Sequence, residues 1–284
     1  LPDSVGGMTL NRFCGSSMEA IHIAAGKIAM GAGDVFIAAG VESMTRIPMS
    51  GFNPLPNAGL YKSRPEAYMN MGITAENVAK SCTISRAAQE AFALTSQQKA
   101  AAADFSGEII PITTKHGVVL TDGCLRPDTT LAGLASLSPA FLESGTVTAG
   151  TSSPLTDGAA AVLVVSEAYA DAHGLPKLAR IKASAIAGIA PEIMGLGPVA
   201  AAEKALKRAG LSIKDMDIVE INEAFAAQAL PCIAQIGVDE GKVNLHGGAL
   251  ALGHPLGASG ARITGKAAQL LHDSGKHYAL ATQC

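Results

Sequence analysis

The chain has 284 residues, of which 48% are hydrophobic and 16% charged, and 24 acidic against 21 basic side chains give a formal net charge of −3. This length supports about two domains with a large hydrophobic core, which excludes a disordered chain and a small disulfide-stapled scaffold. The slightly acidic balance argues against a nucleic-acid partner, and no apolar stretch reaches the roughly 18 residues that a membrane-spanning helix needs.

Apolar residues at spacings of three and four predict a buried helix within residues 15–33, and the apolar run 35–39 predicts a strand after it. Residues 45–130 contain a long proline-rich loop and two polar helices, which begin near Thr74 and Ser85. Ser85 is the expected N-cap of the second helix. We interpret this segment as an insertion into the fold.

After residue 146, strands are predicted at 160–165, 179–183, 218–221 and 278–282, alternating with helices at 200–209, 224–235 and 259–274. This alternation is typical of sheets covered by helices, so the predicted fold class is α/β. A glycine-led helix followed by a strand occurs at 15–40 and again at 257–282. This weak repeat suggests duplicated halves, with Cys14 and His254 near the seam between them.

The cysteines show no short paired spacing of the zinc or dithiol type; they are Cys14, Cys82, Cys124, Cys232 and Cys284. We therefore expect no metal site, a reducing compartment and a cytoplasmic location. The chain begins without Met and stops directly after an apolar run, so we interpret it as a fragment. A targeting segment ahead of the first residue stays possible.

Cys14 lies in Asn-Arg-Phe-Cys-Gly-Ser-Ser, at the N-terminal edge of the first predicted helix. Unpaired N–H groups and the positive end of the helix dipole favour a thiolate there, so we expect the pKa of Cys14 to be lowered and its sulfur to act as a nucleophile. The alternative is a buried structural cysteine.

Two further polar residues, His254 and Asn222, are candidates for the site. His254 stands in a glycine-rich loop ahead of the last helix, where it suits a base that deprotonates a thiol; the alternative is a turn histidine bonded to backbone. Asn222 follows the strand 218–221, at the end where α/β sheets bind ligands, and its amide can orient water or stabilise an oxyanion. Asn222 also suits a helix cap.

Six groups of segments carry a resemblance that covers the whole chain: Asn11–Ser17 with Val41–Met44, Met71–Asn77, Gly145–Gly150 through Asp157–Ala161, Asn222–Ala226, Gly247–Pro255 and the terminal Cys284. In this order they resemble the thiolase family, and more closely its degradative type, the 3-ketoacyl-CoA thiolases or acetyl-CoA acyltransferases. Asn70 stands where acetoacetyl-CoA thiolases usually carry His, which favours the degradative type.

The resemblance implies a duplicated αβαβα layered sandwich with an inserted loop domain and an incomplete N-terminal half. Residues 1–44 and 156–177 would belong to the N-terminal half, 45–155 to the loop domain and 178–284 to the C-terminal half. Thiolases carry more chain ahead of the nucleophile, and a glycine of the oxyanion hole after the second cysteine. Both lie outside this chain, so we expect the isolated polypeptide to be inactive or poorly folded.

The resemblance also implies the roles of four residues. Cys14 would carry the acyl group, His254 would activate it, and Cys284 would act as acid and base on C2 of the acetyl-CoA half. Asn222, through a held water, would stabilise the enolate-like oxygen together with His254. The implied reaction is thiolytic cleavage of 3-ketoacyl-CoA by CoA in fatty acid β-oxidation, with ping-pong kinetics.

CoA is then a substrate, and no tightly bound cofactor is expected. Ser153 matches a serine that contacts the pantetheine arm, and Met71, Met194 and Phe225 match the lining of the acyl and pantetheine tunnel. Ordinary core packing is the alternative for these three. Thiolases are usually dimers or tetramers, so a homodimer or homotetramer is expected.

Three other functions are weighed against this one. A biosynthetic acetyl-CoA acetyltransferase shares the motifs. A decarboxylating ketoacyl synthase shares the duplicated fold but pairs its cysteine with two histidines, whereas this chain offers one motif histidine and a second cysteine. A non-catalytic thiolase-like protein that binds lipid or a partner would have no need of the four site residues.

Overall fold

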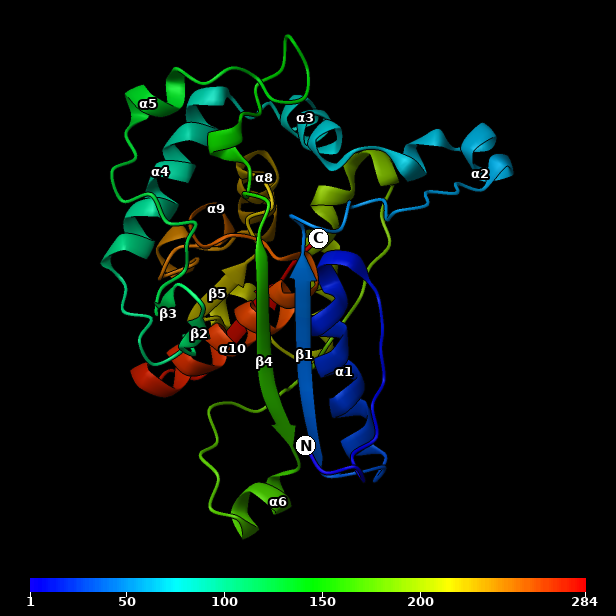
Figure 1. Ribbon diagram of the computed structural model, residues 1–284, viewed down its shortest axis with the longest axis vertical. Helices are drawn as coiled ribbons and strands as arrows, with labels where there is room; N and C mark the ends of the chain where they lie inside the picture. The colour runs from blue at the N-terminus through cyan, green and yellow to red at the C-terminus, as the bar shows by residue number, and fades with distance from the viewer.

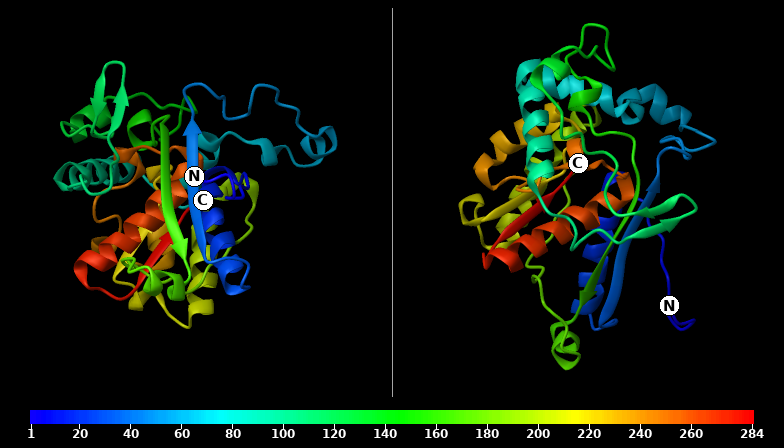
Figure 2. Two further views of the ribbon diagram at one scale, coloured as in Figure 1. Left: turned by 60° about the horizontal axis from the view of Figure 1, so that its bottom comes forward. Right: turned by 60° about the vertical axis from the view of Figure 1, so that its left-hand side comes forward.

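The computed structural model describes residues 1–284 and places two pairs of strands against one long helix (Figure 1). β1 (Val35–Ser43) pairs antiparallel with β4 (Asp157–Val165), and β5 (Ile218–Ile221) pairs parallel with β6 (Ala279–Thr282). The helix α10 (Leu256–Ser274) contacts all four of these strands. Figure 2 shows it running beside both pairs. The fold class is therefore α/β, as predicted.

The remaining elements surround this centre. The other helices are α1 (Ser16–Ala29), α2 (Ala58–Ser63), α3 (Met71–Ser81), α4 (Arg86–Ala102), α5 (Leu131–Ala135), α6 (Glu167–Ala172), α7 (Gly197–Ala209), α8 (Ala226–Ile236) and α9 (Ala249–Leu252). A hairpin of β2 (Ile112–Thr114) and β3 (Gly117–Val119) was not predicted from the sequence. None of the helices is both long enough and apolar enough to cross a membrane.

The pair β1–β4 buries one face only. Its nine-residue register runs from Val35 opposite Val165 to Ser43 opposite Asp157. On the inner face, Ala38 and Val164 pack against Ile21 and Ala24 of α1. The predicted strands 35–39 and 160–165 and the first predicted helix are confirmed, and both strands are longer than predicted because the pairing continues through small residues.

The pair β5–β6 lies in the largest apolar cluster of the molecule. All four residues of β5 are buried. The cluster consists of Ala202, Met216, Val219, Ile221, Ile233, Val243 and Leu280. The predicted strands at 218–221 and 278–282 are confirmed. β5 is mostly apolar and is buried on both faces, including at Glu220, its one polar residue.

The predicted strand at 179–183 is wrong. Residues 176–190 form neither helix nor strand until a 3-10 turn, η4, begins at Pro191. Their carbonyls are bonded by side chains of α7 instead of by another strand: Arg208 Nη1 donates to Ser184 O at 2.5 Å and Lys204 Nζ to Ile186 O at 3.1 Å. A segment that could form a strand does so only where a neighbouring strand supplies hydrogen bonds.

The two helices predicted within residues 45–130 are confirmed. α3 covers the helix predicted near Thr74, and α4 begins after Ser85, whose hydroxyl accepts a hydrogen bond from Ala88 N–H at 3.2 Å as an N-cap does. α2 projects away from the rest of the molecule (Figure 1).

Candidate active site

A buried histidine and a buried asparagine meet at the carboxyl end of β5. Asn222 directly follows β5, and its backbone N–H donates to Thr282 O of β6 at 3.0 Å. Asn222 Nδ2 lies 3.4 Å from Nε2 of His254, while Asn222 Oδ1 is buried without a protein partner. Because α8 is preceded by Phe225, Asn222 does not cap that helix, and the capping alternative is wrong.

Two further side chains hold His254 in place. Nδ1 of the imidazole lies 2.5 Å from Ser259 Oγ, and the backbone N–H of His254 donates to Thr156 Oγ1 at 3.1 Å. The ring therefore has a partner at each nitrogen, and both partners are side chains. The alternative of a turn histidine bonded through its ring to backbone is wrong.

The imidazole of His254 is uncharged at neutral pH. Burial lowers the pKa of His254 to about 4, and the positive charge of Arg262 lowers it further. An uncharged imidazole keeps one ring nitrogen with a free electron pair, which is what a general base requires.

Cys14 lies at the start of α1, as the sequence indicates, but it is not activated in the way expected. It sits in a single 3-10 turn, η1 (Phe13–Gly15), after Phe13, whose φ of 48° is unusual for a non-glycine residue. Burial raises the pKa of Cys14 to about 11 and outweighs the lowering by a backbone hydrogen bond. The expected lowering of this pKa is therefore wrong, because loss of hydration opposes the thiolate more than the helix terminus favours it.

The segment that carries Cys14 packs against the helix that follows His254. η1 contacts α10, and Ala261 N–H of α10 donates to Ser17 Oγ of α1 at 2.8 Å. A side chain added at Gly260 would overlap the backbone of Met18. Glycine and serine at these positions let the two helices approach closely.

Cys284 follows β6 and is influenced by Cys14. Burial raises the pKa of Cys284 well above its ordinary value, and a charge on Cys14 raises it further. No hydrogen bond joins either thiol to the His254 ring, whose partners in this structure are Asn222 and Ser259.

The four predicted CoA-contacting residues lie on elements that pack together. Ser153 N–H donates to Ala224 O at 3.0 Å, directly before Phe225, whose ring meets Phe141 edge-on with centroids 5.8 Å apart. Met71 begins α3, and Met194 lies in η4 (Pro191–Leu196), which packs on α3 and α8. Phe225 also packs against the buried cluster between α3 and α8.

Three polar residues that surround His254 and Asn222 were not identified from the sequence: Ser259, Thr156 and Glu223. Ser259 and Thr156 bind His254. Glu223 is buried and accepts hydrogen bonds from Ser96 Oγ at 2.6 Å, Asn244 Nδ2 at 2.7 Å and Leu250 N–H at 3.2 Å. The available signal was the position of Glu223 directly after Asn222 and of Ser259 five residues after His254.

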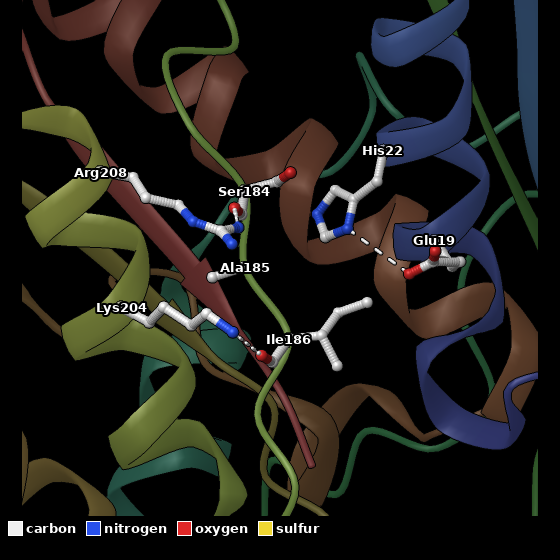
Figure 3. A pocket seen from close by; sticks show the side chains of 7 residues that line it. All are labelled: Glu19, His22, Ser184, Ala185, Ile186, Lys204 and Arg208. Carbon is white, nitrogen blue, oxygen red and sulfur yellow. Dashed lines mark hydrogen bonds and ion pairs between the residues drawn. The ribbon is translucent and has the colours of Figure 1, made fainter.

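A surface hollow elsewhere contains none of these residues. It has a volume of about 240 Å³ and lies between α1, the coil 184–186 and α7 (Figure 3). Its lining is Glu19, His22, Ser184, Ala185, Ile186, Lys204 and Arg208. Its two basic side chains are already bonded to backbone carbonyls. No group of three or more His, Cys, Asp or Glu side chains is arranged to hold a metal ion.

Comparison with known families matches nearly the whole chain. The family model described as "Thiolase, N-terminal domain" matches residues 1–168, and the one described as "Thiolase, C-terminal domain" matches residues 175–284.

Relatives of known sequence and structure agree with this match. The chain is 50% identical to a 3-ketoacyl-CoA thiolase of Pseudoalteromonas translucida and 44% identical to one of Bacillus subtilis. Both alignments include all of this chain, and they cover 76% and 77% of the length of those two proteins. The crystal structure of human mitochondrial 3-ketoacyl-CoA thiolase superposes with a TM-score of 0.91 at 40% identity, covering all of this chain and 76% of that one. The structure of the dimeric peroxisomal thiolase of Saccharomyces cerevisiae superposes with a TM-score of 0.91 at 41% identity. This match covers all of this chain and 74% of that one.

Proposed function

This chain belongs to the thiolase family, and we propose that it catalyses the thiolytic cleavage of 3-ketoacyl-CoA by CoA, giving acetyl-CoA and a shortened acyl-CoA in fatty acid β-oxidation. The observation that carries the proposal is the 50% identity, over the whole chain, to a protein named 3-ketoacyl-CoA thiolase. Cys14, Asn222, His254 and Cys284 lie in the segments on which the resemblance rests.

We also propose which residues form the two halves of the layered fold and which form the loop domain. Residues 1–44 and 156–177 would form an N-terminal half, 178–284 a C-terminal half of the same layered αβαβα type, and 45–155 an inserted loop domain. In support, α1 and α10 pack together, each follows one of the two catalytic segments, and α10 contacts both pairs of strands.

At rest, the proposed site is uncharged. Burial favours the thiol over the thiolate at Cys14 and the neutral over the protonated form of His254. Transfer of the proton from Cys14 Sγ to Nε2 of His254 would therefore accompany attack on the substrate, when the developing charge moves onto the substrate oxygen.

The first half-reaction forms an acyl-enzyme. Cys14 Sγ would attack the C3 carbonyl carbon, the C2–C3 bond would break, and its electron pair would remain on the acetyl-CoA half as an enolate. Asn222 and His254 would stabilise the thioester oxygen of that enolate, and the buried, unpartnered Oδ1 of Asn222 suits the binding of a water there. The thiol of Cys284 would donate its proton to C2, since its raised pKa keeps that proton in place until a carbanion forms.

The second half-reaction releases the acyl group. The thiolate of Cys284, left after protonation of C2, would take the proton of the CoA thiol. The CoA sulfur would attack the acyl carbon, and Cys14 would leave as a thiolate that regains its proton from the imidazolium of His254. Ser153 would contact the pantetheine arm of CoA, and Met71, Met194 and Phe225 would line the tunnel. A structure of the human mitochondrial 3-ketoacyl-CoA thiolase is described as a complex with CoA.

We further propose that the enzyme works as a homodimer or homotetramer in the cytoplasm, without a tightly bound cofactor. In support, the solved yeast relative is described as dimeric, and all five cysteines of this chain are free thiols.

The test is acyl transfer to Cys14. After mixing the full-length protein that contains this chain with acetyl-CoA, mass spectrometry should find the acetyl group on the peptide that contains Cys14, and Cys14→Ser should lower thiolysis at least about 1,000-fold. Cys82→Ser is the matched control, because Cys82 ends α3 with Gln235 Nε2 as its nearest partner from another element, at 3.7 Å. Acetylation at another cysteine, or none, would contradict the proposal.

A substrate comparison separates the degradative from the biosynthetic reaction. We expect a C8 or longer 3-ketoacyl-CoA to be cleaved with a higher kcat/KM than acetoacetyl-CoA. The opposite order would favour a biosynthetic acetyl-CoA acetyltransferase.

A further inference from the structure

The hydroxyl of Ser259 is the partner of the ring nitrogen of His254 that faces away from Asn222. Ser259 is fully buried and lies in the first turn of α10, and its Oγ is 2.5 Å from Nδ1 and 3.4 Å from the carbonyl oxygen of Pro255. A serine hydroxyl has one proton to donate and two electron pairs to accept with. It can therefore serve both neighbours only by donating to the carbonyl and accepting from the imidazole.

The contact between Nε2 of His254 and Asn222 also places the ring proton on Nδ1. Nδ2 of Asn222 carries only protons, so at 3.4 Å it meets a favourable partner only if Nε2 presents a free electron pair. A neutral imidazole with a free pair on Nε2 carries its proton on Nδ1. Asn222, His254, Ser259 and Pro255 then form one continuous chain, with every donor facing an acceptor.

We infer that Ser259 is a positioning residue that fixes His254 in the tautomer with the proton on Nδ1 and the free pair on Nε2. This inference rests on the proposed function for its catalytic consequence, because Nε2 is then the atom that takes the proton from a substrate or enzyme thiol. In the opposite tautomer, an N–H at Nε2 would face the N–H groups of Asn222, and the base would be lost.

Because His254 is buried, the hydroxyl of Ser259 can determine the tautomer of its ring. His254 is 3% exposed, so no bulk water replaces a missing partner at Nδ1, and an unpaired buried donor costs about 1–3 kcal/mol. When Nε2 gains a proton, Nδ1–H becomes a stronger donor and its bond to Ser259 strengthens. An uncharged hydroxyl provides this orientation without adding a negative charge that would raise the pKa of the ring at rest.

The inference is tested first on the unaltered protein. In 15N-detected NMR at pH 7, with the His254 signals identified by their loss in His254→Gln, Nδ1 should show the shift of a protonated nitrogen and Nε2 that of an unprotonated one. A proton on Nε2 would overturn the inference, and it would mean that the Asn222 amide presents Oδ1 to the ring. This measurement does not depend on whether the protein has thiolase activity.

Substitution then tests the consequence. Ser259→Ala should lower kcat for thiolysis by about 10- to 100-fold with little change in KM, and it should convert part of His254 to the other tautomer. Ser259→Thr, which retains the hydroxyl, should restore most of the activity and the original tautomer. Ser274→Ala is the matched control, because its hydroxyl bonds Leu270 O at the far end of the same helix.

The outcomes separate the two proposals. If Ser259→Ala folds, keeps the tautomer and keeps kcat within twofold of Ser274→Ala, Ser259 has no positioning role. If the unaltered protein shows the expected tautomer but does not acylate Cys14, the proposed function fails and the assignment of the tautomer stands.

Discussion

Single residues at the site owe their ionisation to burial more than to their position in the helices. The sequence places Cys14 beside a helix N-terminus, where a dipole favours a thiolate by typically 0.3–1 kcal/mol. In the structure, burial raises the pKa of the same thiol to about 11. Each pKa unit corresponds to about 1.4 kcal/mol, so the burial of a thiolate outweighs the dipole. Local sequence predicted a nucleophile with a lowered pKa, and the structure contradicts the lowered pKa.

Alkylation of Cys14 distinguishes these two influences. Because only the thiolate reacts, the rate of modification by iodoacetamide in the absence of substrate should keep rising with pH up to about pH 10. Peptide mass spectrometry at each pH would follow Cys14 separately from the other thiols. A rate that levels off below pH 8 would support the helix terminus as the dominant influence.

At the level of elements, the position of His254 depends on how closely β1 approaches α10. Gly40 lies in the middle of β1, and a side chain there would overlap the backbone of Gly257 and Ala258 in the first turn of α10. Gly257 N–H also donates to Glu42 Oε2 of β1 at 3.0 Å. His254 and Ser259 flank this contact, so the strand fixes the region that holds the base.

Gly40→Ala should therefore disturb both stability and the site. We expect the free energy of unfolding to fall by about 3 kcal/mol, since a packed backbone has to move, and the tautomer of His254 to become mixed. The control is Gly26→Ala on the exposed side of α1, where no atom lies within 4 Å of the added carbon and a gain of about 0.5–1 kcal/mol is expected. Thermal or urea unfolding measures both, and equal stabilities for the two variants would refute the close-contact argument.

Across the whole molecule, charged side chains of α10 act on groups that lie far apart in the sequence. Lys266 of α10 is buried and forms an ion pair with Glu108, ahead of the β2–β3 hairpin. Glu220 of β5 is also buried, and burial raises its pKa to about 8 although Arg262 and Lys266 act in the opposite direction. Arg262 in turn lowers the pKa of His254. The positive charges of α10 therefore influence both Glu220 and His254.

Glu220 should make stability fall as the pH rises. Its folded pKa of about 8 exceeds the ordinary glutamate pKa of 4.5, so the folded protein holds a proton that the unfolded chain releases between these two values. The free energy of unfolding should therefore decrease between about pH 5 and pH 8. Glu220→Gln should remove this contribution and be more stable than the parent at pH 8.5 by on the order of a few kcal/mol, with no difference near pH 4.5.

Urea unfolding of both proteins across this range provides the measurement, and the difference between them cancels the titration of all other groups. Parallel pH profiles would show that Glu220 is already ionised in the folded protein.

Much of the local structure was predictable because it depends on neighbours in the chain. β5 is rich in β-branched apolar residues and is a buried strand as predicted, and Ser85 caps α4 through its own hydroxyl. The order of the motifs likewise predicted the family, which the family models confirm. The strand predicted at 179–183 has no partner strand, and the carbonyls of Ser184 and Ile186 just after it accept hydrogen bonds from α7 instead.

By itself, the sequence determined the fold class, the family and most helices and strands, since composition, motif order and short-range periodicity encode these, and it predicted which side chains carry chemistry. Only the tertiary structure decided how those side chains are ionised and held. The partners of His254 come from β5, α10 and the segment ahead of β4, and its charge state depends on burial by all of them. Such contacts join residues up to about a hundred positions apart, and hydration is lost only when the folded chain closes around them.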